Sequence, residues 1–222
     1  MGTLKYLGHS AFELVMGDTV MFIDPWLGGT SAKRSVPSAL ANAHSIKKCD
    51  IIFLTHEHFD HCDPEVVKEI AERTYASVVA PRETLAMLDI PQKLKVDVKE
   101  GDDFDLKGVH VRVVKAVHPQ SRHPVGYIIS DGNTSIYHAG DTYEYSEMMD
   151  IKCDYALLPI GGTYTMDDIA AEKAAKNIQC KAVIPMHFDT FDQIKSDPMT
   201  FAKGLEGRKK VILMRYGAEL KF

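Results

Sequence analysis

The stretch that decides the fold is Thr55-His56-Glu57-His58-Phe59-Asp60-His61, in which four potential metal ligands fall within six residues. Residues 51–54 directly before it form a short apolar run rich in β-branched side chains, and such a run predicts a buried strand. Asp63 and Pro64 after it indicate the start of a helix, because aspartate caps helices and proline fits their first turn. The sequence therefore predicts a ligand-bearing loop between a central strand and a helix.

The spacing of this loop divides its ligands into two pairs. His56 and His58 alternate along the chain and are expected to converge on one ion, while Asp60 and His61 turn toward a second position. A borderline ion takes about four ligands in a structural site, or three and a water in a catalytic one, so more ligands must come from elsewhere. Imidazole and carboxylate suit zinc, manganese or iron. We expect two divalent metal ions, with zinc as the first candidate and manganese or iron as alternatives.

Three later residues each follow an apolar, strand-like run and precede a polar loop, namely His118, Asp141 and His187. With these three residues, each pair of ligands from the loop gains the further ligands that its metal ion needs. We expect one metal to be held by His56, His58 and His118, the other by Asp60, His61 and His187, and Asp141 to bridge between them. Only folding can bring these seven side chains together.

The other histidines fit this pattern less well. His123 lies in the same loop as His118 and is its main rival as the third ligand of the first metal. His138 is expected to face away from the metals on its strand, and His44 and His110 are typical of surface or core histidines. An exchange of His118 for His123 would leave the predicted chemistry unchanged.

Taken together, these blocks resemble the metallo-β-lactamase superfamily, whose hallmark is a His-x-His-x-Asp-His loop followed by a lone His, a lone Asp and a lone His. Within it, the chain is similar to the small metal-dependent hydrolases related to ascorbate-phosphate lactonases. The further matching blocks are Leu7-Gly8-His9-Ser10, Tyr137-His138-Ala139-Gly140-Asp141-Thr142, Leu158-Pro159-Ile160-Gly161-Gly162 and Pro185-Met186-His187. The resemblance implies an α/β (α+β) fold, namely a four-layer αββα sandwich, with a binuclear centre and hydrolase activity.

Two departures narrow what the resemblance implies. Drug-hydrolysing members commonly carry a cysteine where this chain has Asp141, which argues against antibiotic hydrolysis. RNA-processing and DNA-repair members carry large inserted domains, for which 222 residues leave no room.

The predicted chemistry is hydrolysis at a two-metal site. Two close divalent ions can hold a metal-bridging hydroxide at neutral pH and polarise a carbonyl or phosphoryl oxygen of the substrate. We therefore expect a metal-dependent hydrolase of a small ester, lactone or phosphodiester. Asp60 is the predicted catalytic residue, since a carboxylate within hydrogen-bond reach can orient the hydroxide and take or relay its proton.

Four further residues are candidates for substrate contact or for holding the metal ligands in place. His9 follows the first predicted strand, where Gly8 permits a tight turn and the imidazole can point into the pocket. The others are Thr142, Thr165 and Thr190, which lie near ligand-bearing or glycine-rich loops and can donate hydrogen bonds there. Threonines in such loops also often cap turns, and this alternative stays open.

Two other function classes compete with hydrolysis. Related folds can carry a di-iron redox centre, but those relatives usually show glutamate at the position of His58. A non-catalytic metal-stabilised binding module is the second alternative, and such a module would be expected to have lost ligands. The chain retains all seven, so the hydrolase is the leading hypothesis.

Chain length, composition and net charge limit the number of domains and the classes of partner that we expect. A chain of 222 residues with 45% hydrophobic composition can bury one substantial core, so residues 1–222 are expected to form a single metallo-hydrolase domain. The formal net charge of −5 disfavours general nucleic-acid binding. The four cysteines show no paired spacing, and neither a membrane span nor a signal-peptide core is visible. These features predict a cytoplasmic protein with no membrane partner, and a homo-oligomer with twofold symmetry is the commonest form of soluble assembly.

Residues 25–48 interrupt the predicted strands and contain a polar loop. This loop is long enough to act as a lid over a neighbouring pocket, and the alternative is an ordinary surface loop. Lys33 and Arg34 in this loop, with Arg122, are candidates to anchor an anionic small-molecule substrate. Residues 10–16 and 19–24, before this loop, are predicted to form a β-hairpin. The chain after it is predicted to mix strands and helices.

Overall fold

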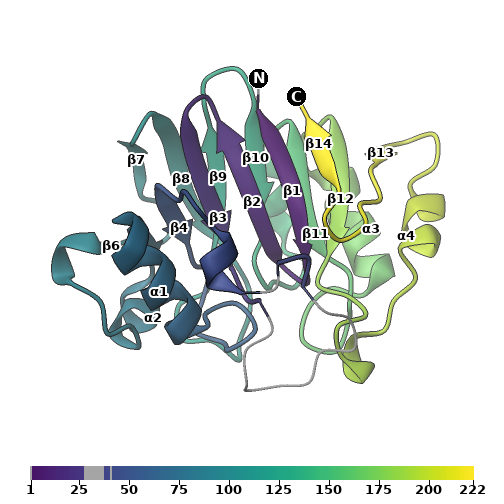
Figure 1. Cartoon of the computed structure of the whole chain (residues 1–222). Helices are drawn as coiled ribbons and strands as arrows, with labels where there is room; N and C mark the ends of the chain where they lie inside the picture. The colour runs from purple at the N-terminus through teal and green to yellow at the C-terminus, as the bar shows by residue number, and fades with distance from the viewer. Residues whose placement is uncertain (1, 28–37, 41) are drawn as a thin grey trace.

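The computed structural model describes residues 2–27, 38–40 and 42–222, and two facing β-sheets form its centre (Figure 1). The strands of the first sheet are β1 (Thr3–Gly8), β2 (Ala11–Met16), β3 (Thr19–Ile23), β4 (Ile51–Phe53), β5 (Ser77–Ala80), β6 (Lys95–Asp97) and β14 (Glu219–Lys221). They lie in the order β14-β1-β2-β3-β4-β5-β6. The strands β3 to β6 pair in parallel, whereas β14, β1, β2 and β3 pair antiparallel.

The second sheet consists of β7 (Asp103–Leu106), β8 (Val109–Lys115), β9 (Val125–Ser130), β10 (Ser135–His138), β11 (Tyr155–Pro159), β12 (Ala182–Met186) and β13 (Lys210–Val211). Its order is β13-β12-β11-β10-β9-β8-β7. The strands β10 to β13 run parallel, so the residues that follow β10 and β12 emerge at the same edge. This edge meets the end of β4 and carries the ligand loops.

Helices cover the outer faces of both sheets, which gives the four layers αββα that the resemblance implied (Figure 1). They are α1 (Pro64–Thr74), α2 (Arg82–Ala86), α3 (Asp168–Asn177) and α4 (Pro198–Gly204), with 3₁₀ turns η1 (Ala43–Ser45), η2 (Gln92–Leu94), η3 (Ser146–Asp150) and η4 (Asp192–Ile194). The helices α1 and α2 lie outside the first sheet, and α3 and α4 outside the second. Within the described parts of the chain, no helix combines the length and apolarity that a membrane crossing requires.

The strand β4 shows why the run before the histidine loop is wholly apolar. Ile51 and Phe53 belong to the core between the sheets, while Ile52 packs in a second core beneath α1. Successive side chains of a strand point to opposite faces, so a strand covered on both sides is apolar at every position. The loop that follows therefore starts from a fully buried anchor.

Local sequence signals predict most of these elements closely. Asp63 caps α1 by accepting from the backbone N–H of Val66, and the predicted hairpin is confirmed by the antiparallel pairing of Met16 with Thr19. The apolar run predicted before His118 forms β8, which ends at Lys115. The middle of the predicted lid over residues 25–48 falls outside the described residues, which omit 28–37 and 41.

Tyr127 links the two sheets directly below the histidine loop, and replacing it tests this link. Its buried hydroxyl, on β9, donates to the backbone carbonyl of Leu54, 2.8 Å away, at the end of β4. Tyr127→Phe is expected to lower the free energy of unfolding by about 1–2 kcal/mol, because that buried carbonyl loses a donor. Urea denaturation measures the loss. Tyr75→Phe, at a 70% exposed side chain, is the matched control and should change nothing measurable.

Candidate metal centre

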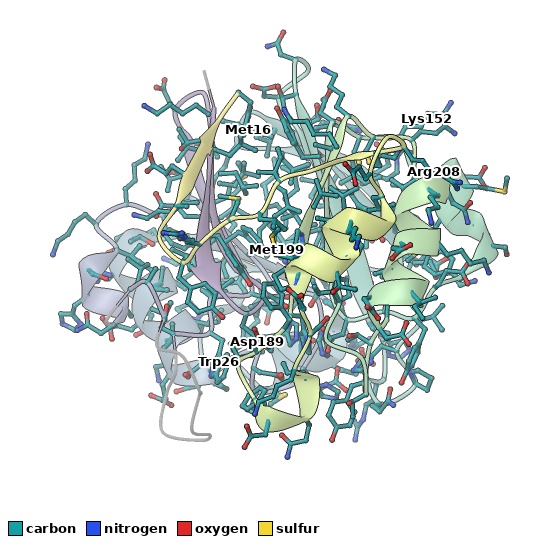
Figure 2. The ribbon with its side chains drawn as sticks, turned by 90° about the vertical axis from the view of Figure 1, so that its right-hand side faces the viewer. Met16, Trp26, Lys152, Asp189, Met199 and Arg208 are labelled. Atoms are coloured by element: carbon teal, nitrogen blue, oxygen red, sulfur yellow. The ribbon has the colours of Figure 1, made fainter. Side chains whose placement is uncertain are left out.

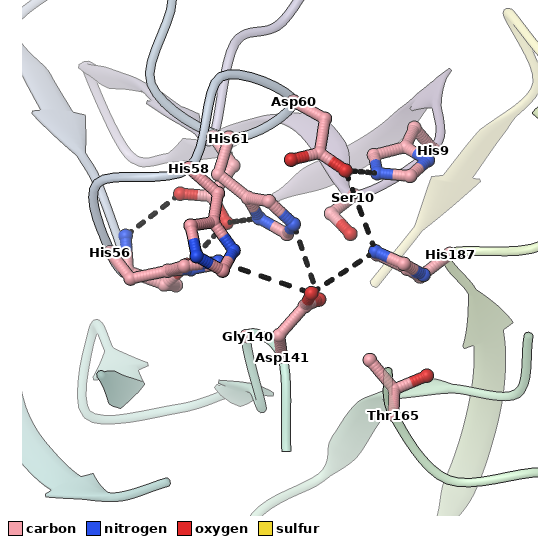
Figure 3. Close-up of polar contacts among 12 residues, drawn as sticks. His9, Ser10, His56, His58, Asp60, His61, Gly140, Asp141, Thr165 and His187 are labelled. Atoms are coloured by element: carbon pink, nitrogen blue, oxygen red, sulfur yellow. Dashed lines mark hydrogen bonds and ion pairs between the residues drawn. The ribbon is translucent and has the colours of Figure 1, made fainter. Parts of the chain in front are cut away.

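The predicted ligands come from loops that leave the two sheets at one edge. His56, His58, Asp60 and His61 follow β4, His118 follows β8, Asp141 follows β10, and His187 follows β12. Figure 3 shows the side chains of the β4 loop, Asp141 and His187 pointing toward one another. The structure thus places all seven predicted residues in one cluster, in which His58 and Asp60 are half-buried and the other five are buried.

The first group of potential ligand atoms comprises His56, His58, His118 and Asp141, which lie within 4.8 Å of one another. His58 Nδ1 is 3.2 Å from His118 Nε2. Asp141 Oδ2 is 3.9 Å from His56 Nε2 and 3.8 Å from His118 Nε2. This grouping matches the ligand set predicted for the first metal and includes His118 instead of its rival His123.

The second group comprises Asp60, His61 and His187, as predicted for the second metal, and adds His9; these atoms also lie within 4.8 Å of one another. Asp60 Oδ2 is 3.1 Å from His9 Nε2 and 3.9 Å from His187 Nε2. His9 was predicted to contact substrate or to support a ligand. Its position makes it a potential fourth ligand of this group.

Asp141 lies between the two groups. Besides its contacts in the first group, its Oδ1 is 3.2 Å from His61 Nε2 and its Oδ2 is 3.2 Å from His187 Nε2 (Figure 3). Gly140 permits this placement, because its φ of 61° is left-handed and an added Cβ would lie 2.9 Å from both Thr55 Cβ and the carbonyl oxygen of Val125. One carboxylate therefore faces both potential metal positions.

Hydrogen bonds to the second ring nitrogen orient three of the histidines. His61 Nδ1 is 2.7 Å from Asp24 Oδ2, and His56 Nδ1 is 3.0 Å from Thr55 Oγ1. His58 Nε2 is 3.2 Å from the carbonyl oxygen of Gln120 and donates to it. Such contacts fix the tautomer and leave the other nitrogen unprotonated toward the centre, as metal ligation requires.

Asp24 is a supporting residue that the sequence analysis did not single out. It follows β3, is fully buried, and accepts hydrogen bonds from His61, from the Thr55 backbone N–H at 2.8 Å and from the Thr55 hydroxyl at 2.7 Å. The signal that points to it is an aspartate at the end of a predicted strand, a position shared with the recognised ligands. Asp24 thus ties the end of β3 to the histidine loop.

Three residues at the centre hold left-handed backbone conformations that non-glycine residues seldom adopt. The φ angles are 60° for His9, 44° for Asp24 and 56° for His187. Each costs about 1–2 kcal/mol relative to the ordinary conformation. Surrounding bonds maintain them, among them a 2.9 Å hydrogen bond from His187 N–H to the carbonyl of His9. Strain of this kind is concentrated at functional sites.

The unpaired atoms of the cluster fit bound cations. The Nε2 atoms of His56, His61 and His187 and the Oδ1 of Asp141 are buried and form no hydrogen bond among the described residues, although the nitrogens face the Asp141 carboxylate at 3.2–3.9 Å. A buried polar atom without a partner costs about 1–3 kcal/mol. Divalent ions would supply partners for these atoms, and a set of imidazoles and carboxylates suits zinc, manganese or iron.

Electrostatics hold most of these groups in the protonation states that ligands need. Burial, reinforced by the neighbouring His187, lowers the pKa of His9 to about 3, and burial also lowers the pKa values of His56 and His118. Burial by itself would raise the pKa of Asp60, but the hydrogen bond from His9 and the charge of His61 lower it. His9, His56 and His118 are therefore neutral, and Asp60 is ionised, at neutral pH. His61 differs: burial by itself would lower its pKa, but the carboxylates of Asp141 and Asp24 raise it well above the ordinary value.

The remaining predicted residues divide into those near the cluster and those away from it. Thr190 Oγ1 contacts His9 Nδ1 directly. Thr142 Oγ1 accepts from the backbone N–H of Val117 at 2.9 Å and thereby anchors the segment that leads to His118. The Thr165 hydroxyl is buried and donates to the backbone carbonyl of Met166, 3.4 Å away, which is a contact within its own loop.

The histidines that were set aside as ligands lie outside both groups. His44 pairs with Glu69, His110 with Asp103 and Asp105, and His123 with Glu83. His138 is buried and donates from Nε2 to the carbonyl of Ser10, 2.9 Å away. All four therefore have partners away from the cluster.

Asp24→Asn is expected to weaken metal binding by about 10–100-fold, because the ligand His61 loses its anionic partner. Titration with zinc against a chromophoric chelator measures the affinity. The matched control is Asp50→Asn, since Asp50 accepts from Val20 N–H at 2.9 Å and lies outside the cluster. Equal metal affinity in both variants would show that Asp24 only braces the backbone.

Comparison with known proteins agrees with this geometry. A family model described as "Beta-lactamase superfamily domain" matches residues 3–187. A "UPF0173 metal-dependent hydrolase" from Caldivirga maquilingensis is 36% identical over 228 residues, which cover 98% of this chain and 96% of the relative. A relative of the same description from Thermoplasma acidophilum is 37% identical over 219 residues, covering 93% of this chain and 92% of that protein.

A solved structure with the same architecture is that of Igni18, described as a metallo hydrolase from the archaeon Ignicoccus hospitalis. It is 32% identical in sequence, with a TM-score of 0.83, and the match covers 100% of this chain and 99% of that one. The described ligand groups fit bound metal, and the relatives' shared description names both metal dependence and hydrolysis. The chain therefore belongs to the metallo-β-lactamase superfamily and, within it, to the UPF0173 metal-dependent hydrolases.

Proposed function

We propose that this metal-dependent hydrolase uses two divalent ions to hydrolyse a small ester, lactone or phosphodiester. The observation that supports the proposal most directly is the pair of ligand groups, each within 4.8 Å, with Asp141 facing both. In this proposal His56, His58 and His118 hold one ion, Asp60, His61 and His187 hold the other, and Asp141 bridges. Zinc is the first candidate, with manganese or iron as alternatives.

When bound, such ions supply an activated water as the nucleophile and a Lewis acid for the oxygen of the scissile group. The residues of the chain then orient the water and manage its proton. Asp60 is the proposed catalytic residue, because its ionised carboxylate lies at the pocket and can accept the proton of the attacking water. His9, itself held by Thr190, donates to Asp60 and fixes its orientation.

A pocket of about 530 Å³ opens beside both ligand groups and suits a small molecule. His58, Asp60, His118, Asp141 and His187 are among the residues that line it. Substrate entering this pocket would therefore meet the proposed catalytic carboxylate and ligands of both ions. The shape of the pocket supports a small-molecule substrate rather than a polymer lying across a flat surface.

The decisive experiment measures metal content and hydrolysis on the same sample. We expect about two zinc or manganese ions per chain by elemental analysis. Cleavage is then assayed on a panel of neutral esters, lactones and phosphodiesters. A redox-active iron pair with no hydrolysis would support the di-iron alternative, and stoichiometric metal without turnover on the panel would support a binding module. The description of the relatives as hydrolases favours neither of these.

We also infer that residues 1–222 act as one domain. The pairing of β1 with β14 supports this, since Thr3 lies opposite Lys221 and residues from both ends of the sequence share one sheet. A cytoplasmic location and a homo-oligomeric state stay predictions, to be checked by fractionation and by light scattering.

A further inference from the structure

One wall of the pocket beside the metal centre is aromatic. Phe59, from the loop after β4, and Phe191, from the loop after β12, both line the pocket, with ring centroids 6.1 Å apart. Trp26, which follows β3, packs against both, stacked on Phe191 at 5.4 Å and edge-on to Phe59 at 6.0 Å. Figure 2 shows Trp26 and Asp189, which precedes Phe191 in the same loop, toward the end of the molecule opposite Met16. We call Phe59, Phe191 and Trp26 the aromatic wall.

The exposure of Phe59 indicates that the aromatic wall serves a ligand. Its side chain is 46% exposed, whereas Trp26 behind it is 1% exposed. An exposed phenyl ring carries an unfavourable hydration free energy that a bound apolar group would relieve. Small-molecule sites are typically lined by apolar and aromatic side chains with a few polar groups placed among them. Ile194 extends the apolar surface at the same pocket.

The described lining of this pocket offers an anionic substrate no cationic side chain. It includes no lysine or arginine, and Glu57 adds an acidic group beyond the proposed metal ligands Asp60 and Asp141, whose charge bound ions would offset. The Glu57 carboxylate accepts from Ser121 Oγ at 2.7 Å and from Arg122 N–H at 2.9 Å, so it serves as a fixed acidic brace between two loops. Recognition of a phosphate or carboxylate by a protein ordinarily needs lysine or arginine at the contact.

The described lysine and arginine side chains that lie near the pocket residues in sequence contact other parts of the molecule. Arg122, predicted as an anchor for an anionic substrate, lines a separate pocket with Glu83 and His123. Lys195 forms a 2.9 Å ion pair with Asp192. The other two predicted anchors, Lys33 and Arg34, lie outside the described residues.

We propose that the aromatic wall binds an uncharged apolar group of the substrate, such as an aryl group, and that the substrate is a neutral ester or lactone rather than a phosphodiester. This inference rests on the proposed hydrolase function and narrows it. Water adds its oxygen to the carbonyl carbon, the bond from that carbon to the alkoxy oxygen breaks, and the alkoxy oxygen takes a proton. The products are a carboxylic acid and an alcohol, or a hydroxy acid from a lactone.

Binding to the aromatic wall can be measured without turnover, because Trp26 is the single tryptophan of the sequence. Benzyl alcohol titrated into the metal-loaded protein is expected to change the Trp26 fluorescence in a saturable way, and ethanol is not. Phe59→Ala should weaken benzyl alcohol binding about tenfold, as loss of a hydrophobic pocket contact does. Tyr75→Ala, which removes an exposed aromatic ring elsewhere, should leave it unchanged. A linear, unsaturable response would overturn the inference.

Kinetics then test the preference for an apolar, uncharged group. Benzyl acetate and ethyl phenylacetate place a ring on the alcohol or the acyl side, and ethyl acetate lacks the ring. At least one ring-bearing ester is expected to exceed ethyl acetate in kcat/KM by about tenfold or more, and Phe59→Ala and Phe191→Ala should remove that advantage. Tyr75→Ala, at an exposed ring outside the pocket, should keep it. A carboxylate on the ring should lower kcat/KM by a similar factor.

The outcomes separate this inference from the proposed function. Saturable benzyl alcohol binding that depends on Phe59, with no hydrolysis of any ester or lactone, would uphold the apolar site and refute hydrolysis of such substrates. Hydrolysis of the carboxylated ester as fast as the neutral one, or faster cleavage of a phosphodiester, would refute the aromatic wall as the determinant and point to cationic residues such as Lys33 and Arg34. Ring-dependent hydrolysis supports both proposals.

Discussion

Asp60→Asn is expected to lower kcat by about 10²–10⁴-fold, the usual contribution of general base catalysis. Asparagine keeps the size of the side chain and one oxygen that can accept from His9, but it cannot take up a proton from water. Asp60 Oδ2 lies 3.1 Å from His9 Nε2, so its position is fixed by a contact that the amide can retain. The loss should therefore appear in turnover much more than in stability.

Three measurements on the Asp60→Asn protein distinguish catalysis from metal loss, namely kcat on the best substrate, metal content by elemental analysis and unfolding in urea. Asp63→Asn is the matched control, because Asp63 lies in the same loop and caps α1 without contacting a ligand. Asparagine caps helices about as well as aspartate, so that variant should keep its kcat and nearly all of its stability. An Asp60→Asn protein with full metal content and full rate would refute the catalytic role.

Removal of metal by a chelator is expected to abolish activity and to lower the melting temperature by roughly 10 °C. An ion present at about 1,000 times its Kd stabilises the fold by about 4 kcal/mol, and in a chain of this size about 1 kcal/mol shifts the melting temperature by roughly 2–4 °C. The unpaired nitrogens of His56, His61 and His187 explain the cost, since without cations they stay buried and unsatisfied. Adding back zinc or manganese should restore both properties.

Asp141→Ala provides the test of the shared carboxylate. Because Asp141 faces both ligand groups, its loss should weaken both metal positions and make the melting temperature nearly insensitive to chelator. Asp154→Ala serves as a control, since Asp154 pairs with Lys181 away from the cluster. If the Asp141→Ala protein still bound two ions tightly, the bridging role would be refuted.

Local patterns predicted the elements whose own residues determine them. Pro64–Thr74 begins with a capping aspartate and proline, and Ala182–Met186 is apolar at every position because both of its faces are covered. The sequence analysis did not identify Asp103–Leu106, Tyr155–Pro159 or Glu219–Lys221 as strands. The first and last have exposed alternate positions, and their pairing with β8 and β1 decides their conformation rather than their own propensity.

What the sequence by itself determined is the ligand chemistry. The His-x-His-x-Asp-His spacing, with His118, Asp141 and His187 each placed after an apolar run, was sufficient to predict the two ligand groups and the resemblance to the family, and that resemblance implied the αββα layers. This was possible because ligand types and strand ends are local properties, visible within a few residues of the chain.

Only the tertiary structure decided which neighbours complete the centre. His9 lies 51 positions from Asp60, and Asp24 lies 37 positions from His61, yet each pair is in hydrogen-bond contact. The aromatic wall likewise joins loops after β3, β4 and β12. No local pattern encodes such contacts, because they depend on how two sheets stack and on which backbone turns bring their loops to the same edge.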